Sequence, residues 1–305
     1  MKYIEIGKQL KASAVALGCM RIAGLERKPA EELLQTALAA GIDFFDHADI
    51  YGGGGSESVF AQAMQDAGVG RDKVLLQTKC GIRKGFFDFS KEHIVDSLEK
   101  SLQRLKTDYV DVYMLHRPDT LMEPEEVAEA FAALHKAGKV RHFGVSNQNP
   151  AQMRLLGKYL GERRIIANQL QFSPAHTGMI NLGLNVNMLN ASSVDHDGSV
   201  LEFCRLEDIT LQAWSPFLYG FFEGVFLGDA KFPELNAQID LLAKAKGVSP
   251  EAIVIAWILR HPAKIQPIPG TTKPERVQSL CQACAIDLSR EEWYQIYCAA
   301  GNVLP

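Results

Sequence analysis

The segment YVDVYMLHRPDTLMEPEEVAEAFAALHKAGKVRHFGV, Tyr109–Val145, contains a strand, a helix and a second strand. Its two ends, Tyr109–Leu115 and Val140–Val145, are short apolar runs, as expected for strands buried on both faces. Between them Pro124 suits the first turn of a helix. The apolar residues of this helix recur at helical spacing: Val127, Phe131 and Leu134. The segment predicts a βαβ unit with parallel strands.

The same alternation continues on both sides of this segment. The predicted strands are Ala14–Gly18, Ile42–Asp46, Val74–Lys79, Tyr109–Leu115, Val140–Val145, Ile165–Leu170, Ile209–Trp214 and Ile265–Ile268. Predicted helices begin at Pro29, Ser56 (as N-cap), Ser90 (as N-cap), Pro124, Pro150, Val200, Leu235, Pro250 and Pro274, and Ser289–Ala299 forms an appended helix. Eight such units in 305 residues favour a closed barrel over an open sheet. We therefore predict an α/β fold, a single (β/α)8 TIM barrel over residues 1–305 with an additional C-terminal helix.

Composition narrows the class of protein. Hydrophobic residues make up 47% and charged residues 22%, which is ordinary globular usage. With a net charge of −4 and no block of Lys and Arg, no nucleic-acid partner is expected. No apolar run approaches the ~20 residues needed to cross a bilayer, so no membrane partner is expected. The six cysteines do not suggest a disulfide framework or a metal site. Reduced thiols and no targeting signal predict a cytoplasmic protein, whose oligomeric state the pattern does not indicate.

One long stretch breaks the alternation. Residues Gln171–Ser199 show no clear periodicity and are rich in Asn, Ser and Gly. A loop of this length inside a compact domain usually covers a site or is disordered. We expect it to be where substrate specificity resides.

Titratable side chains follow three successive predicted strands. Asp46 ends the second strand, with Tyr51 in the loop behind it; Lys79 ends the third strand, and His116 follows the fourth. In a closed barrel, catalytic residues lie at the C-terminal ends of the strands. We therefore expect these four catalytic candidates to converge at one rim.

The four groups suit the reduction of a carbonyl, which needs a hydride and a proton. A tyrosine hydroxyl, with a free pKa of ~10, can give the proton if a nearby ammonium lowers that pKa. We assign Tyr51 as the proton donor, Lys79 as the ammonium and Asp46 as its counter-charge. His116 is expected to orient and polarise the carbonyl and, at some pH values, to help Tyr51 donate its proton.

Seven stretches, in order along nearly the whole chain, resemble the aldo-keto reductase superfamily. They are FDHADIYGGGGSE (45–57), QTKCG (77–81), YMLHRPD (113–119), GKVRHFGVSN (138–147), NQLQFSP (168–174), AWSPF (213–217) and PIPGTTKPERV (267–277). HADIYGG and HRPD, together with KVRHFGVSN, most resemble the bacterial YdhF-like oxidoreductases. The resemblance implies NADP(H), with NAD(H) a weaker expectation, bound extended across the barrel mouth. This agrees with the absence of a G-x-G-x-x-G motif after a strand.

The resemblance also implies a set of cofactor residues. They are Met20, Arg21, Ser146, Asn147, Gln169, Trp214, Ser215, Phe217, Gly270, Thr271, Thr272 and Arg276. Ser146, Asn147 and Gln169 would hold the carboxamide, Trp214 would stack on the nicotinamide ring, and Ser215 and Phe217 would line the pyrophosphate path. The residues from Gly270 to Arg276 would hold the adenosine 2′-phosphate at a helix start, where free N–H groups attract anions. Many relatives have a lysine where Gly270 stands, so Arg276 with Lys273 must supply that charge.

The substrate is expected to be a small carbonyl compound, an apolar aldehyde or ketone. Its pocket is expected to include Met20, Ile22, Phe86, Phe87, Phe89, Arg117, Phe217, Tyr219, Phe221 and Phe222. Two other functions remain open. A lyase or isomerase could use Lys79 as a Schiff-base nucleophile, but would give no role to Tyr51 and Trp214 together. The same fold could also be a catalytically weak NADPH-binding sensor or regulatory subunit.

Overall fold

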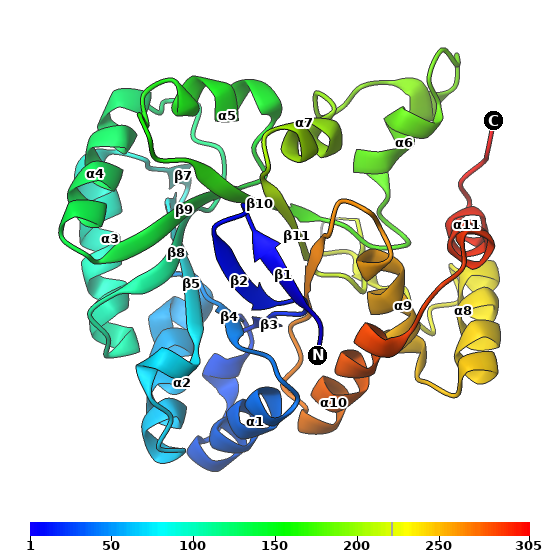
Figure 1. Cartoon of the computed structure of the whole chain (residues 1–305), viewed down its shortest axis with the longest axis horizontal. Helices are drawn as coiled ribbons and strands as arrows, with labels where there is room; N and C mark the ends of the chain where they lie inside the picture. The colour runs from blue at the N-terminus through cyan, green and yellow to red at the C-terminus, as the bar shows by residue number, and fades with distance from the viewer. Residues whose placement is uncertain (221) are drawn as a thin grey trace.

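The computed structural model of the chain describes residues 1–220 and 222–305. Its barrel strands are β3 (Leu17–Gly18), β4 (Phe44–Asp46), β5 (Leu75–Cys80), β8 (Val110–Leu115), β9 (Val140–Ser146), β10 (Ile165–Gln171), β11 (Thr210–Trp214) and β14 (Gln266–Ile268). The surrounding helices are α1 (Arg27–Ala39), α2 (Gly55–Asp66), α3 (Lys91–Leu105), α4 (Pro124–Lys136), α5 (Pro150–Gly157), α7 (Val200–Leu206), α8 (Pro233–Lys246), α9 (Pro250–Leu259) and α10 (Pro274–Gln282). Figure 1 shows this ring of helices around the strands.

The eight strands pair in parallel in the order β14-β11-β10-β9-β8-β5-β4-β3. Two backbone hydrogen bonds join the two ends of this sheet. Ala16 N donates to Pro267 O and Gly18 N donates to Pro269 O, both at 3.0 Å. The sheet therefore closes on itself, and the predicted (β/α)8 barrel is confirmed.

A hairpin that the sequence analysis did not predict covers the N-terminal end of the barrel. It consists of β1 (Tyr3–Ile6) and β2 (Leu10–Ser13) and lies across the middle of the barrel in Figure 1. At its turn Gly7 adopts a φ of 57°, and its N–H donates to Thr210 Oγ1 at 2.9 Å. A Cβ on Gly7 would lie 2.5 Å from Ile166 Cβ, so the close approach of the turn to the barrel requires glycine.

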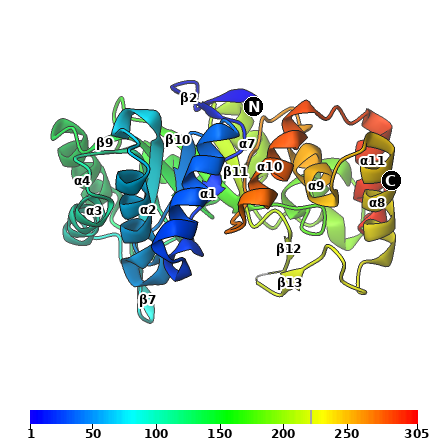
Figure 2. The same cartoon turned by 90° about the horizontal axis from the view of Figure 1, so that it is seen from below.

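Two further hairpins project from the opposite end, as Figure 2 shows. One pairs β6 (Ile82–Arg83) with β7 (Phe86–Phe87), and the other pairs β12 (Leu218–Tyr219) with β13 (Gly224–Val225). They follow β5 and β11, so they stand at the C-terminal mouth of the barrel. The mouth is thus flanked by hairpins, whereas the other end is covered by one.

The helix starts divide into those with and those without a side-chain cap. Ser90 caps α3, as predicted, because its Oγ accepts a hydrogen bond from His93 N. The prediction of Ser56 as the cap of α2 is wrong. Gly54, with a φ of 91°, occupies that position, and Ser56 Oγ instead donates to Met20 O at 3.2 Å. The run of glycines allows this left-handed turn, which sequence periodicity alone did not reveal.

The long stretch after β10 is more ordered than predicted. It contains helix α6 (Gly178–Leu184) and a 3-10 turn at Ala191–Ser193. Figure 1 places α6 at the outer edge of the molecule. Tyr297 Oη donates to Asn181 Oδ1 at 2.9 Å, which ties α6 to the appended helix α11 (Arg290–Ala299).

The appended helix is fixed by two tryptophans. The rings of Trp257 on α9 and Trp293 on α11 stack with their centroids 4.8 Å apart. Each indole N–H donates to the backbone carbonyl of the other tryptophan at 3.0 Å. Since both buried indoles are satisfied by this exchange, the pair holds α11 against the barrel.

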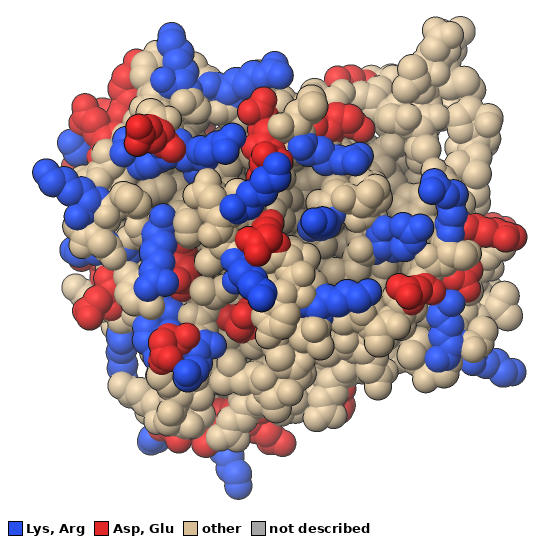
Figure 3. Space-filling view, viewed as in Figure 1, with Lys and Arg blue, Asp and Glu red and all other residues tan. Residues whose placement is uncertain are grey.

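Charges of both signs are interspersed over the face that carries the N-terminal hairpin, as Figure 3 shows. One pair on this face links the hairpin turn to the barrel, with Lys8 Nζ 2.7 Å from Asp208 Oδ1. Among the described residues, no helix is both long and apolar enough to span a bilayer.

Candidate active site

A cavity of about 790 Å³ opens at the C-terminal mouth of the barrel. This is the end where the strand-following loops can present side chains from different βα units to one point. All the residues predicted for catalysis or cofactor binding line this cavity except Lys79, which lies behind its wall. None of residues 171–199 lines it, so the expectation that this stretch sets specificity is not supported.

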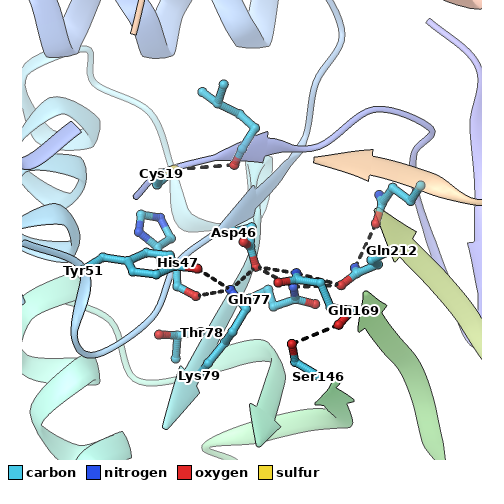
Figure 4. Close-up of polar contacts among 12 residues, drawn as sticks. Cys19, Asp46, His47, Tyr51, Gln77, Thr78, Lys79, Ser146, Gln169 and Gln212 are labelled. Atoms are coloured by element: carbon cyan, nitrogen blue, oxygen red, sulfur yellow. Dashed lines mark hydrogen bonds and ion pairs between the residues drawn. The ribbon is translucent and has the colours of Figure 1, made fainter. Parts of the chain in front are cut away.

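Lys79 is the centre of the catalytic group. Its side chain is fully buried, and Nζ donates to Asp46 Oδ1 at 2.6 Å, to the backbone oxygen of His47 at 2.8 Å and to Tyr51 Oη at 3.3 Å. Figure 4 shows the amine between the carboxylate and the phenol. Asp46 ends β4, Lys79 lies on β5, and Tyr51 opens the turn before α2. Three predicted catalytic residues therefore meet within hydrogen-bond distance.

Burial and charge compete in setting the ionisation of this group. Burial lowers the pKa of Lys79, but the charge of Asp46 and the nearby Tyr51 outweigh it, so the pKa is raised from its usual 10.5. Burial raises the pKa of Tyr51 above 10, although Lys79 acts in the opposite direction. The expectation that the ammonium brings the Tyr51 pKa below its usual value is therefore wrong for this state, because desolvation dominates.

His116 completes the group from the end of β8. Its ring is edge-on to that of Tyr51, with centroids 5.7 Å apart. Burial, together with the positive charges of Lys79 and Arg117, holds the pKa of His116 well below 6.5. The imidazole is therefore neutral at neutral pH. It can donate one hydrogen bond to a carbonyl oxygen, as expected for a group that orients and polarises the carbonyl, but it carries no positive charge at neutral pH.

A second histidine lies beside the site but plays no part in the cavity. His47 is fully buried, packs edge-on against Phe60 with centroids 4.7 Å apart, and does not line the cavity. Neither ring nitrogen has a hydrogen-bond partner among the described residues. Burial, with Lys79 nearby, lowers the pKa of His47 to about 3. Its side chain is thus a neutral, poorly satisfied part of the core.

The residues predicted to hold a carboxamide are already engaged with one another. Asn147 Nδ2 donates to Ser146 Oγ at 2.7 Å, and Ser146 Oγ donates to Gln169 O at 2.9 Å. Trp214 Nε1 donates to Asn147 Oδ1 at 3.3 Å, and its ring stacks on that of Phe222 with centroids 5.7 Å apart. The cavity therefore has an aromatic wall next to a set of fixed amides and hydroxyls.

The other end of the cavity is chemically suited to an anion. It lies at the start of α10, where Thr271, Thr272, Lys273 and Arg276 line it. The free N–H groups of a helix start and two cations attract a phosphate. Glu251 and Leu280, for which the sequence pattern predicted no role, also line the cavity. The cavity is of a size that accepts large organic ligands, and its amide, aromatic and cationic regions fit a nicotinamide dinucleotide phosphate.

The predicted substrate-pocket residues separate into two groups. Met20, Arg117, Phe217 and Phe222 line the cavity, together with Ile50 and Ile82, which the sequence analysis missed. The other described candidates do not line it: Ile22, Phe86, Phe87, Phe89 and Tyr219. Phe86 and Phe87 are exposed on the β6–β7 hairpin, and Phe89 is in the core. Phe221 lies outside the described residues.

A closed barrel that brings a buried lysine and carboxylate together with a half-buried tyrosine and histidine beside a dinucleotide-sized cavity is typical of a nicotinamide-dependent oxidoreductase. The family model described as the aldo/keto reductase family matches residues 14–299. Oxidoreductase YdhF of Escherichia coli is 36% identical, over 88% of this chain and 86% of its own. The 6-dehydroglucose reductase of Agrobacterium fabrum is 33% identical over 98% of both chains. An aldo-keto reductase from Klebsiella pneumoniae, solved in complex with NADPH, superposes with a TM-score of 0.78 at 27% identity, covering 97% of this chain and 93% of that one.

The chain belongs to the aldo/keto reductase family and is an NAD(P)H-dependent oxidoreductase. The predicted resemblance to that superfamily, including its YdhF-like members, is confirmed.

Proposed function

We propose that this enzyme reduces aldehydes or ketones to alcohols with NADPH, using Tyr51 as the proton donor. The observation that carries the proposal is the position of Tyr51 Oη, on the cavity wall and 3.3 Å from the buried Nζ of Lys79. NADPH supplies the hydride when it is bound. The chain itself must hold the carbonyl, deliver a proton and exclude water.

Proton delivery follows from the contacts of the phenol. Tyr51 is protonated at neutral pH, because a tyrosine pKa is ordinarily about 10 and burial raises this one further, so it can donate to a carbonyl oxygen. As negative charge develops on the phenol oxygen, the ammonium of Lys79 stabilises it, and Asp46 keeps that ammonium charged. Neutral His116 supplies a second hydrogen bond to the same carbonyl oxygen. The substrate oxygen would thus lie between the phenol and the imidazole.

Cofactor placement is proposed from the lining of the cavity. Ser146, Asn147 and Gln169 would hold the carboxamide, and Trp214 would cover the nicotinamide ring. Ser215 and Phe217 would line the middle, with Met20 and Arg21 at the mouth. The 2′-phosphate would bind Gly270, Thr271, Thr272 and Arg276. The cations at this end of the cavity, Lys273 and Arg276, support NADP(H) over NAD(H).

The Schiff-base alternative is disfavoured by the state of Lys79. A nucleophilic lysine must be neutral and accessible. Here Nζ is fully buried, donates to three oxygens and has a pKa raised above 10.5 by the balance of burial and Asp46. It acts better as a fixed positive charge.

The test is NADPH oxidation with a panel of small aldehydes and ketones, including 6-aldehydo sugars because of the relative named above. Turnover that disappears with Tyr51→Phe supports the proposal. NADPH binding without turnover across the panel would instead favour the sensor or regulatory subunit.

A further inference from the structure

The side chains of four buried glutamines form a hydrogen-bonded row across the interior of the barrel. Gln77, Gln169, Gln212 and Gln266 lie on β5, β10, β11 and β14 and are at most 2% exposed. Gln169 is in register with Gln212, and Gln212 with Gln266. Buried amides are costly unless they are hydrogen-bonded, and these four bond mainly to each other.

The bonds form one continuous chain. Gln266 Nε2 donates to Ser13 O at 2.8 Å, and Gln212 Nε2 donates to Gln266 Oε1 at 2.9 Å. Gln212 Oε1 then accepts from Gln77 Nε2 at 3.0 Å and from Gln169 Nε2 at 3.2 Å. Figure 4 shows the part of this chain that reaches the catalytic group.

Both outer amides continue to the same carboxylate oxygen. Asp46 Oδ1 accepts from Gln77 Nε2 at 2.6 Å and from Gln169 Nε2 at 3.2 Å, in addition to Lys79. The chain therefore runs from a backbone carbonyl at the N-terminal hairpin to the counter-charge of the catalytic lysine.

The orientation of every amide in this chain is dictated by its two ends. The carbonyl of Ser13 and the ionised carboxylate of Asp46 can only accept hydrogen bonds, whereas each amide has one acceptor and one donor end. Gln266 must therefore turn its nitrogen to Ser13, which leaves its oxygen facing Gln212. Gln212 in turn must donate its nitrogen to Gln266 and present its oxygen to Gln77 and Gln169. Gln77 Oε1 is left buried without a partner among the described residues, because turning the amide round would face that oxygen towards the carboxylate.

This polarity decides what Gln169 offers to a ligand. Its nitrogen is held by Asp46 and Gln212, so the polar atom left for the cavity is Oε1, which can only accept. A ligand group beside it must therefore donate, as the NH2 of a carboxamide does. Gln212 itself does not line the cavity.

We propose that Gln212 is a positioning residue that selects for a carboxamide-bearing cofactor by fixing the amide orientation of Gln169. The inference rests on the proposed use of NADPH. Without the oxygen of Gln212, only the 3.2 Å hydrogen bond to Asp46 still orients the amide of Gln169, so the amide should turn to present its nitrogen in a larger share of the molecules. The site would then also accept a ligand that offers only an oxygen at this point.

The experiment compares two cofactors by binding alone. The reduced 3-acetylpyridine analogue of NADPH carries CH3 in place of the carboxamide NH2 and so keeps only the acceptor. Dissociation constants are measured by quenching of tryptophan fluorescence and checked by calorimetry. The wild-type protein should bind NADPH about fivefold to tenfold more tightly than the analogue, the worth of one hydrogen bond.

Gln212→Met, which keeps the side-chain length but removes the amide, should lower this ratio, while the bond of Gln169 to Asp46 retains part of the preference. Gln148→Met is the matched control. Gln148 is also buried, with 2% exposed, but its side chain takes no part in the hydrogen bonds that link the four glutamines. Gln148→Met should therefore keep the wild-type ratio of NADPH to analogue affinity.

Three outcomes decide the matter. A wild-type protein that binds both cofactors equally overturns the inference, whether or not any variant folds. An unchanged ratio in folded Gln212→Met overturns it as well. A wild-type protein that binds neither cofactor contradicts the proposed function itself and the inference with it.

Discussion

Tyr51 and Lys79 approach to 3.3 Å between the phenol oxygen and Nζ, and the amine is fully buried behind the phenol. A ligand in the cavity can therefore reach the tyrosine but not the lysine. The two residues have separate tasks: one touches the substrate, and the other stabilises charge on its neighbour.

Removal of the phenol should abolish reduction while sparing cofactor binding. Tyr51→Phe removes the only proposed proton donor, and general acid catalysis contributes about 10²–10⁴-fold, so kcat should fall by at least ~100-fold. The dissociation constant for NADPH should stay within about twofold. The control is Tyr159→Phe, because Tyr159 does not line the cavity. Wild-type turnover in Tyr51→Phe would remove this residue as the donor.

The pH dependence of reduction should follow the raised pKa of Tyr51. Because burial raises that pKa above 10, the donor stays protonated at lower pH and is lost only as pH rises through the raised value. His116, whose pKa is held well below 6.5 by burial and nearby cations, should add no limb near pH 6.5. The measurement is the profile of kcat/KM, which reports the free enzyme. A basic limb near pH 7 would show that this ionisation pattern is wrong.

Loss of Lys79 should destabilise the fold as well as stop catalysis. Lys79→Met leaves Asp46 buried without its counter-charge, which costs about 3 kcal/mol or more. The double variant Lys79→Met/Asp46→Asn should regain much of that free energy of unfolding but no activity. Urea titrations measure the first effect and NADPH oxidation the second. Equal stability of the single and double variants would contradict the pairing.

Replacing His47 should stabilise the protein, most of all in mild acid. Its folded pKa of about 3 lies below the unfolded value near 6.5, so the unfolded state binds more protons between these values. The contribution of His47 to the free energy of unfolding is fully present above pH 6.5. It decreases as the pH drops, by at most about 1.4 kcal/mol per pH unit. His47→Leu should remove the contribution of His47 to the slope of the free energy of unfolding against pH. Exposed His135→Leu is the control; equal slopes in wild type and His47→Leu would refute the prediction.

The start of α10 should determine the preference for phosphate. Arg276→Ala removes a cation from the proposed 2′-phosphate site, and a charge-assisted hydrogen bond is worth about 1.5 kcal/mol or more. The ratio of NADPH to NADH affinity should therefore fall about tenfold. Affinity for NADH, which lacks the phosphate, serves as the internal control. A ratio that does not change would place the phosphate elsewhere.

The barrel could be predicted because most of its signals are local. Pro124 and Ser90 mark helix starts through their own chemistry, and the helix Val200–Leu206 begins at the predicted residue. Polar residues at strand ends converge because a parallel barrel brings those ends together. The catalytic quartet could thus be proposed without coordinates, whereas the cofactor residues were expected from the resemblance to the aldo-keto reductases.

The remaining features depend on contacts between distant segments. The N-terminal hairpin is held by Gly7 against Ile166 and Thr210, some 160 to 200 residues away in sequence. The raised pKa of Tyr51 depends on how deeply the assembled barrel buries it. The amide chain through Gln212 needs side chains from four strands to meet in the interior of the barrel. These features depend on contacts between residues far apart in the sequence, so the periodicity of a local segment could not predict them.

The hairpin formed by β1 and β2 also determines how the molecule can be handled. It stands at the end of the barrel opposite the β6–β7 and β12–β13 loops, so a linker fused ahead of Tyr3 would leave from the side away from the mouth. Protein tethered to a biosensor chip through such a linker would present its opening to the flowing solution. Immobilisation through a lysine on the mouth-side hairpin, such as Lys84, would place the surface against the entrance and slow ligand arrival.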